Sequence, residues 1–348
     1  NHGYGALKEQ GNANDTKSIR SLVMKYPLNR NVLQQAQGII VHSQHAKQLA
    51  QDWYGEESTR DWTIIPHICT IPTLTMNRQS SRSLLGLSVD DFVVCSFGFV
   101  GPTKLNRCLL KAWQQTSLAE NKRCKLFFVG QEHADDIKKA IKLAQLSDTV
   151  FVTGWVSEMD FNHFLIAADV GVQLRGNSRG EVSGALHKCM NFGLATIANR
   201  HGAMAEFPED TLYFLPDSFT EEQLTDALEH LWQDVALRTR IGFRAKQVIH
   251  ERNHPLACAE LYKDSIENFY TKSVDKAQAW NLPFAALGAK PSTFSRDDLM
   301  ALARLLAHNI PAKSITQQLF IDITATAGTT LQTGIERVSL ALIHDLIQ

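Results

Sequence analysis

The residues best suited to chemistry lie in the stretch 168–206, whose pattern predicts a strand, a polar loop, a helix, a second strand and a glycine turn. Arg175 and Arg179 flank the polar loop, and guanidinium groups suit a diphosphate because their paired donors match two oxygen atoms. Ser183 and Gly184 stand where the next helix should begin, and free backbone N–H groups there favour an anion. The stretch therefore predicts a phosphate site, with an ordinary strand–helix crossover of an α/β domain as the alternative.

Glu181 belongs to the same predicted helix start. A carboxylate there either complements the positive end of the helix dipole or accepts a hydrogen bond from a sugar hydroxyl. The alternative is structural, with Arg175 and Arg179 forming salt bridges to Glu181 or Glu158. His187 follows on this predicted helix, and a packed helix residue is the favoured interpretation of a lone histidine there.

Lys104 closes the glycine loop FGFVGPTK, in which Gly98 is the first glycine. The pattern places Lys104 at the start of a helix over 104–116. A cation at a helix N-terminus is unfavourable unless an anion lies between them, so Lys104 is predicted to bind the same phosphate. A solvated surface lysine is the alternative. The loop is not a P-loop, which requires G-x-x-x-x-G-K-[ST].

These loops are positioned by apolar strands that alternate with helices from residue 91 onward. Such alternation predicts an α/β fold in which Rossmann-like parallel sheets carry helices on both faces. Right-handed crossovers bring the carboxyl ends of the strands to one edge, where the loops 98–104, 130–133 and 175–184 should meet. The predicted strands are 92–99, 125–129, 149–152, 168–174, 194–198 and 211–215, and the helices between and after them include 132–145, 157–167, 220–232, 235–250 and 255–270.

The chain before residue 76 has the pattern of the back half of another α/β domain. It shows a strand over 38–41, a helix over 42–53 with Ser43 as its N-cap, and a strand over 62–65. The polar stretch 72–83 predicts a connector. We therefore divide the chain into a partial N-terminal Rossmann-like domain (1–75), a C-terminal ligand-binding domain (84–272), a linker with a helix at 296–307 (273–315) and the start of a further module (316–348).

The composition argues against several classes of function. The chain has 348 residues and a formal net charge of -1, so it has no bulk electrostatic attraction to nucleic acid. Its 6 cysteines include no C-x-x-C pair, which favours reduced thiols in a cytosolic protein over a zinc or disulfide framework. No apolar run approaches the roughly 18 residues of a membrane span, and no dinucleotide-binding fingerprint occurs.

Whole segments of the chain resemble a known family. The phrases SFGFVGPTK, FFVGQEH, VFVTGWVSEMDFNHFLIAADVGVQL and RGEVSGALHKCMNFGLATIANRHGAMAE are similar to the nucleotide-sugar-binding domain of glycosyltransferase family 4-like enzymes of GT-B fold. HGYGAL and GIIVHSQHAKQLA resemble the acceptor-side domain of such enzymes. The tail QLFIDITATAGTTLQTGIERVSLALIHDLI resembles the start of a further glycosyltransferase module. The resemblance implies a fragment of a multi-module bacterial polysaccharide synthase, of the O-antigen (lipopolysaccharide) or capsule type.

The resemblance also implies roles for single residues. Glu181 would be the catalytic residue that contacts the donor sugar, and His2, in the glycine-flanked loop NHGYG, would lie on the acceptor side. Lys188 stands where the family carries the acidic residue that binds the ribose. Transfer would retain the anomeric configuration without a metal or cofactor, and the donor phosphate would accept the proton of the acceptor hydroxyl. The donor would be bound by Gly98, Lys104, Val156, Arg175, Arg179, Ser183, Gly184 and Lys188.

Together these features predict a retaining hexosyltransferase. Its donor would be a nucleotide-diphosphate sugar, with GDP-mannose favoured, and its acceptor would be a growing glycan. The predicted partners are donor, acceptor and further modules of the same parent chain, without nucleic acid. The predicted location is the cytoplasm, with peripheral association at the inner membrane left open. One alternative is a degenerate, non-catalytic module for glycan binding or module assembly, which Lys188 favours. Another is a sugar epimerase of similar fold, which the loop RGEVSG does not fit.

Overall fold

The computed structural model describes residues 33, 36–72, 76–132, 136–279 and 295–309. The chain divides into two compact units, Asn1–Glu267 and Asn268–Gln348. The first unit ends inside helix α13 (Pro255–Ala279), and the second contains α15 (Arg296–Asn309), which agrees with the helix predicted at 296–307. His2 and the module predicted at 316–348 lie outside the described residues.

A six-stranded parallel sheet forms the centre of the first unit. Its strands follow the order β5, β4, β3, β6, β7, β8, and every neighbouring pair is parallel. All residues of β3 are buried, as expected for a strand covered on both faces. The predicted α/β fold with a parallel sheet is therefore confirmed. The strands are β3 (Phe92–Phe97), β4 (Cys124–Val129), β5 (Val150–Val152), β6 (Val170–Gln173), β7 (Thr196–Asn199) and β8 (Tyr213–Leu215).

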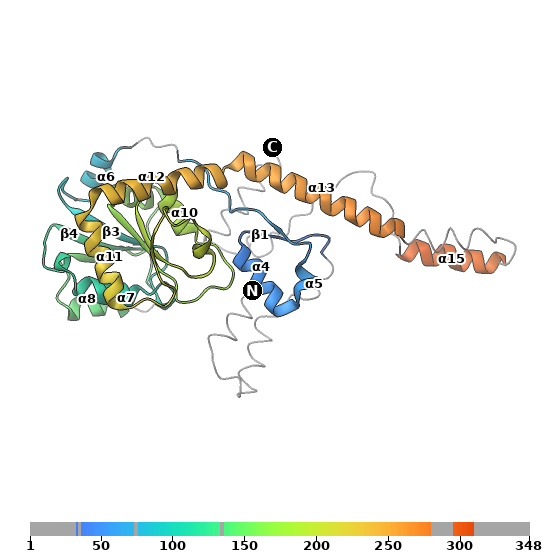
Figure 1. Ribbon diagram of the computed structural model, residues 1–348, viewed down its shortest axis with the longest axis horizontal. Helices are drawn as coiled ribbons and strands as arrows, with labels where there is room; N and C mark the ends of the chain where they lie inside the picture. The colour runs from blue at the N-terminus through green and yellow to red at the C-terminus, as the bar shows by residue number, and fades with distance from the viewer. Residues whose placement is uncertain (1–32, 34–35, 73–75, 133–135, 280–294, 310–348) are drawn as a thin grey trace, which may run out of the picture. The chain divides into compact units, whose positions relative to one another are not determined.

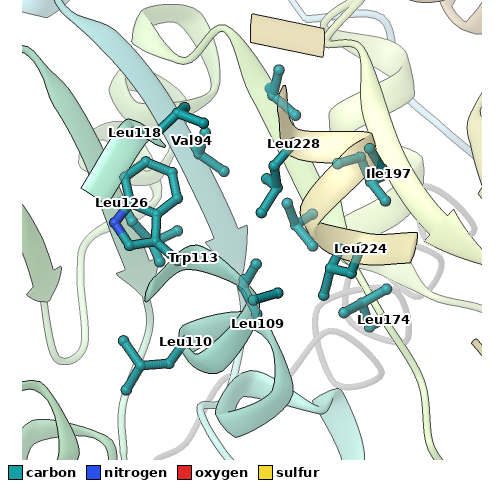
Figure 2. Close-up of a cluster of buried hydrophobic side chains, with 14 of the residues drawn as sticks. Val94, Leu109, Leu110, Trp113, Leu118, Leu126, Leu174, Ile197, Leu224 and Leu228 are labelled. Carbon is teal, nitrogen blue, oxygen red and sulfur yellow. The ribbon is translucent and has the colours of Figure 1, made fainter. Parts of the chain in front are cut away.

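Helices cover both faces of this sheet (Figure 1). Figure 2 shows the core of one face, where Trp113 and Leu224 meet strand residues such as Val94. Val93, the neighbour of Val94 on β3, belongs to the core of the opposite face, so the two cores together fix the register of the strand. One face carries α7 (Asn106–Gln114), α8 (Asp136–Leu143) and α11 (Glu221–Gln233), and the other carries α6 (Arg78–Leu84), α9 (Glu158–Ala167), α10 (Gly184–Asn191) and α12 (Val235–Arg252).

The strand order creates a switch point between β3 and β6. From β3 the chain winds outward through β4 to β5, and it then returns to the other side of β3 and continues from β6 to β8. Connections on the two sides of this point run to opposite faces of the sheet, and in open α/β sheets this arrangement creates a crevice outside the carboxyl ends of the two strands. Ligands of open α/β sheets bind in such crevices, so the loops after β3 and β6 are the first place to look for a site.

The front of the described chain contributes two short strands and two helices to the same unit. β1 (Ile40–Val41) and β2 (Thr63–Ile64) pair in parallel, and α4 (Gln44–Tyr54) and α5 (Glu56–Thr59) connect them. Ser43 is the N-cap of α4, as predicted, because its hydroxyl accepts a hydrogen bond of 3.0 Å from the backbone N–H of Ala46.

Helix α6 (Arg78–Leu84) occupies the second half of the stretch 72–83, so the prediction of a connector is wrong there. The helix begins after Asn77, whose side chain caps it, and it carries Arg82, which is only 3% exposed. Arg82 forms an ion pair of 2.8 Å with Asp169 and donates to the backbone carbonyls of Ala167, Ser88, Val89 and Asp91. The helix is held by a buried arginine rather than by an apolar stripe, so hydrophobic periodicity did not reveal it.

Candidate active site

The loop after β3 brings a lysine back over the end of its own strand. Lys104 donates a hydrogen bond from Nζ to the backbone carbonyl of Phe97, the last residue of β3. Gly98 makes this possible, because it adopts a φ of +98° and a Cβ at its position would lie 2.1 Å from Lys104 Nζ. Gly98 and Lys104, which are both predicted to bind the donor, therefore lie next to each other.

The predicted helix boundary at Lys104 is wrong. Lys104 ends the 3-10 helix η1 (Pro102–Lys104), Leu105 adopts a left-handed φ of 50°, and α7 begins at Asn106. The cause is Asn106, whose side chain accepts from the backbone N–H of Gly101 at 2.8 Å and donates to a strand hydroxyl. This tight turn buries the ammonium group of Lys104, and burial lowers its pKa to about 7.

The loop after β6 places a guanidinium next to the start of α10. Arg175 donates from Nη2 to the hydroxyl of Ser183 at 3.0 Å, and its backbone exchanges two hydrogen bonds of 2.9 and 2.8 Å with the side chain of Asn199. Burial lowers the pKa of Arg175, and the charge of Glu181 acts in the opposite direction. The charge of Arg175 in turn helps to lower the pKa of Lys104, so the two loops place two cations in one electrostatic environment.

The start of α10 lies later than predicted. Ser183 is the N-cap and Gly184 the first helical residue, so Glu181 and His187 do not share a helix. Glu181 instead closes the loop, where it is exposed and accepts a hydrogen bond of 2.7 Å from the backbone N–H of Arg179. A Cβ added at Gly184 would meet no atom within 4 Å, so there is open space next to the first turn of α10.

Lys188 and Val156 contact α9 and the core instead of the two cations. Lys188 forms an ion pair of 2.9 Å with Glu158, and its Nζ lies 5.1 Å from the centre of the Phe161 ring. Val156 follows β5 and packs, partly buried, against the apolar core beneath α9. Glu158, the partner considered for the arginines, is thus engaged by Lys188.

Three histidines that the sequence did not bring together form a chain of ring contacts. The ring centres of His42 and His67 lie 5.8 Å apart, and those of His67 and His187 lie 5.5 Å apart. His187 is buried, its Nδ1 lies 2.8 Å from the backbone carbonyl of Ser183, and burial lowers its pKa to about 4. The packed interpretation of His187 is therefore confirmed. His67 lies far away in sequence, and no local pattern reveals it.

One metal-binding spacing, H-E-x-x-H, occurs at 250–254 in the sequence HERNH. Such a motif needs both histidines on one helix. Here α12 ends at Arg252, and His250 hydrogen-bonds to Asn191 at 2.8 Å. The spacing is therefore not presented on a continuous helix, and among the described residues no group of three or more His, Cys, Asp or Glu side chains is arranged to hold a metal ion.

Comparisons with known proteins show which family and fold the chain resembles. Residues 77–248 match the family of glycosyl transferases group 1. This part of the chain is similar to that family, and the predictions of a GT-B fold and of a glycosyltransferase are confirmed at that level. A search among curated proteins found no match to the sequence.

Solved structures of low sequence identity share the fold. A sucrose-phosphate synthase from Thermosynechococcus elongatus is 18% identical with a TM-score of 0.63, covering 78% of this chain and 67% of that one. HepE from Anabaena, solved with UDP and glucose, is 15% identical with a TM-score of 0.60, covering 73% and 68%. WaaG, a glycosyltransferase of lipopolysaccharide biosynthesis, is 18% identical with a TM-score of 0.52, covering 60% and 57%. In the part of the chain that the structure describes, no helix is both long and apolar enough to cross a membrane.

Proposed function

We propose that the chain transfers a hexose from a nucleotide-diphosphate sugar to a glycan acceptor, and that the crevice between β3 and β6 binds the diphosphate. The observation that carries this proposal is the convergence of two partly buried cations, Lys104 and Arg175, at the carboxyl ends of these two strands. The charge of Arg175 contributes to lowering the pKa of Lys104, and such a pair of neighbouring cations is costly unless an anion lies between them.

The start of α10 completes the proposed diphosphate site. Ser183 receives the hydrogen bond from Arg175 and caps the helix, so the guanidinium and the first turn of α10 face one region. The open space at Gly184 leaves room for phosphate oxygens beside the backbone N–H groups. Gly98 is also required for the site, since only a residue without Cβ lets the ammonium group of Lys104 lie against the end of β3.

Glu181 is the group we assign to the donor sugar. It lies between the arginine loop and the N-cap of α10, and its carboxylate is exposed while one oxygen is held by the backbone of Arg179. In this proposal the reaction retains the anomeric configuration. The leaving phosphate accepts the proton of the acceptor hydroxyl, and Lys104 and Arg175 stabilise the negative charge that develops on that phosphate.

Lys188 cannot accept the hydroxyl protons of a ribose, because an ammonium group has no acceptor lone pair. Its ion pair with Glu158 brings a carboxylate to the same place from the neighbouring helix α9. We infer that Glu158, held by Lys188, contacts the ribose in place of the carboxylate that the family carries on α10.

The base of the donor is a separate question. HepE was solved with UDP, whereas the predicted donor carries GDP, so both UDP and GDP sugars are candidates. A glycan of the bacterial polysaccharide type remains the proposed acceptor.

Isothermal titration of the full chain with UDP, GDP, ADP and dTDP tests the proposal. We expect saturable binding of one of them, and loss of at least tenfold in affinity for Lys104→Met, since a charge-assisted hydrogen bond contributes about 1.5–3 kcal/mol. Lys142→Met, which removes an exposed lysine of α8, is the matched control. Absence of binding by all four nucleotides would refute the diphosphate site.

A degenerate, non-catalytic module is the second candidate, and the lysine at position 188 favours it. The two functions are separated by donor hydrolysis and sugar transfer measured for the parent and for Lys188→Glu. An inactive parent that binds nucleotide and gains turnover with the glutamate would establish degeneration. An active parent would exclude it.

A further inference from the structure

The loop that carries the proposed sugar-binding glutamate rests on helix α4, a segment more than 120 residues earlier in the chain. A Cβ added at Gly180 would lie 3.4 Å from Ala46 Cα and 3.6 Å from Leu49 Cδ1. Gly180 also has a φ of +96°, so the loop turns sharply where it touches α4, one residue before Glu181. The position of α4 therefore limits where the backbone of this loop can lie.

The first turn of α4 is held by the carboxylate of Glu206, which lies in the turn after β7. Glu206 accepts hydrogen bonds from the backbone N–H groups of Gln44 at 3.0 Å and His45 at 2.7 Å. The hydroxyl of Ser43 takes the next N–H, that of Ala46. These three N–H groups have no partner within a helix, so Glu206 and Ser43 together satisfy the helix start, and the negative charge matches its dipole.

Glu206 is itself fixed to the core of the first unit. It ends the 3-10 helix η3 (Gly202–Glu206), directly after β7, and Arg252 of α12 lies 3.9 Å from its carboxylate. A Cβ added at Gly202 would lie 2.8 Å from Ser178 Oγ and 3.2 Å from His45 Cδ2. The turn after β7, the arginine loop and α4 are thus in mutual contact, and the carboxylate of Glu206 ties α4 into this junction.

We propose that Glu206 is a positioning residue: by holding α4 it keeps the 175–181 loop, and with it Arg175 and Glu181, in the geometry that binds the donor. This inference rests on the proposed function for its link to donor binding. Two charged hydrogen bonds to a helix start are strong enough to decide whether α4 stays packed against the 175–181 loop.

Hydrogen exchange of backbone amides, followed by mass spectrometry, tests the mechanical part without any ligand. For Glu206→Gln in the full chain we expect faster exchange in the first turn of α4 and in the 175–181 loop, with α9 unchanged. Leu49→Ala, which weakens the contact of α4 with Gly180 but leaves the carboxylate in place, should accelerate exchange in the loop and not in the first turn of α4. Faster exchange in α4 alone for Glu206→Gln would reduce Glu206 to a helix cap and overturn the proposal.

Nucleotide titration tests the functional part. We expect the dissociation constant of the nucleotide that binds the parent to rise roughly three- to tenfold in both variants, and Glu206→Asp to recover part of it. Glu222→Gln, which neutralises an exposed carboxylate in the first turn of α11, is the matched control and should change neither readout. A parent that binds no nucleotide would refute the diphosphate site while the exchange data still decide whether Glu206 orders the loop. Unchanged affinity in both variants, with a parent that binds, would overturn the positioning role.

Discussion

Lys104 offers a sharp test because its charge should change when the donor binds. Burial, and secondarily the charge of Arg175, lower the pKa of this lysine to about 7 in the free protein. A diphosphate next to Nζ favours the charged form and raises the pKa again. Binding above pH 7 must therefore take up a proton, whereas binding at pH 6 takes up almost none.

The size of the effect follows from the pKa of the free protein. At pH 8 only about one tenth of the free lysines carry the proton, so donor binding should take up about 0.9 proton there and about 0.5 at pH 7. The dissociation constant should rise about tenfold per pH unit above pH 7, until the pH reaches the pKa of the bound form. A nucleotide sugar is the proper ligand, because its diphosphate has no terminal phosphate that titrates near pH 6.

Calorimetry in buffers of different ionisation enthalpy measures this uptake directly. The slope of the observed binding enthalpy against buffer ionisation enthalpy gives the number of protons, and we expect it to vanish in Lys104→Met. Lys142→Met, the exposed-lysine control, should keep the parent slope. A parent slope near zero at pH 8, or an unchanged slope in Lys104→Met, would refute the assignment of Lys104 as a buried phosphate ligand.

Three further predictions concern stability and the geometry of the site. Gly98→Ala should lower the free energy of unfolding by about 1–2 kcal/mol through backbone strain, and it should also weaken nucleotide binding because the new Cβ displaces Lys104. Gly86→Ala is the control, since Gly86 has a φ of +67° and a Cβ there would meet no atom within 4 Å. This variant should show the loss of stability without the loss of binding. Arg82→Met should destabilise the unit by about 3 kcal/mol in denaturant unfolding, since it removes one of the two arginines paired with Asp169 and leaves several backbone carbonyls without their donor. The parent should lose stability between pH 6.5 and pH 4, because unfolded His187 takes up a proton there while the folded residue stays neutral with a pKa of about 4. This term amounts to about 3 kcal/mol, and His187→Gln should flatten the pH dependence of unfolding over that range.

The sequence predicted the parts of this structure that depend on local patterns. Buried strands such as 92–97 stand out because every residue is apolar or small, and Ser43 is a typical N-cap in front of a helix. Helix starts were less accurate at loops where side chains outweigh propensity. Asn106 delays α7 by bonding across its own turn, and the left-handed glycine at position 180 delays α10.

The contacts that give the site its character join residues far apart in sequence, and no periodicity encodes them. Lys188 illustrates the consequence. In the sequence it is a lysine where a carboxylate is expected, which favours loss of function. In the structure the same lysine holds Glu158, a carboxylate from another helix, at 2.9 Å.

A double exchange, Lys188→Glu with Glu158→Lys, separates the two interpretations, since it restores the carboxylate on α10 and keeps the pair. If the pair is what the donor requires, the exchanged protein should bind nucleotide within a few-fold of the parent, while Glu158→Lys alone, which sets two cations against each other, should bind at least tenfold more weakly. Equal binding by all three proteins would show that neither residue contacts the donor.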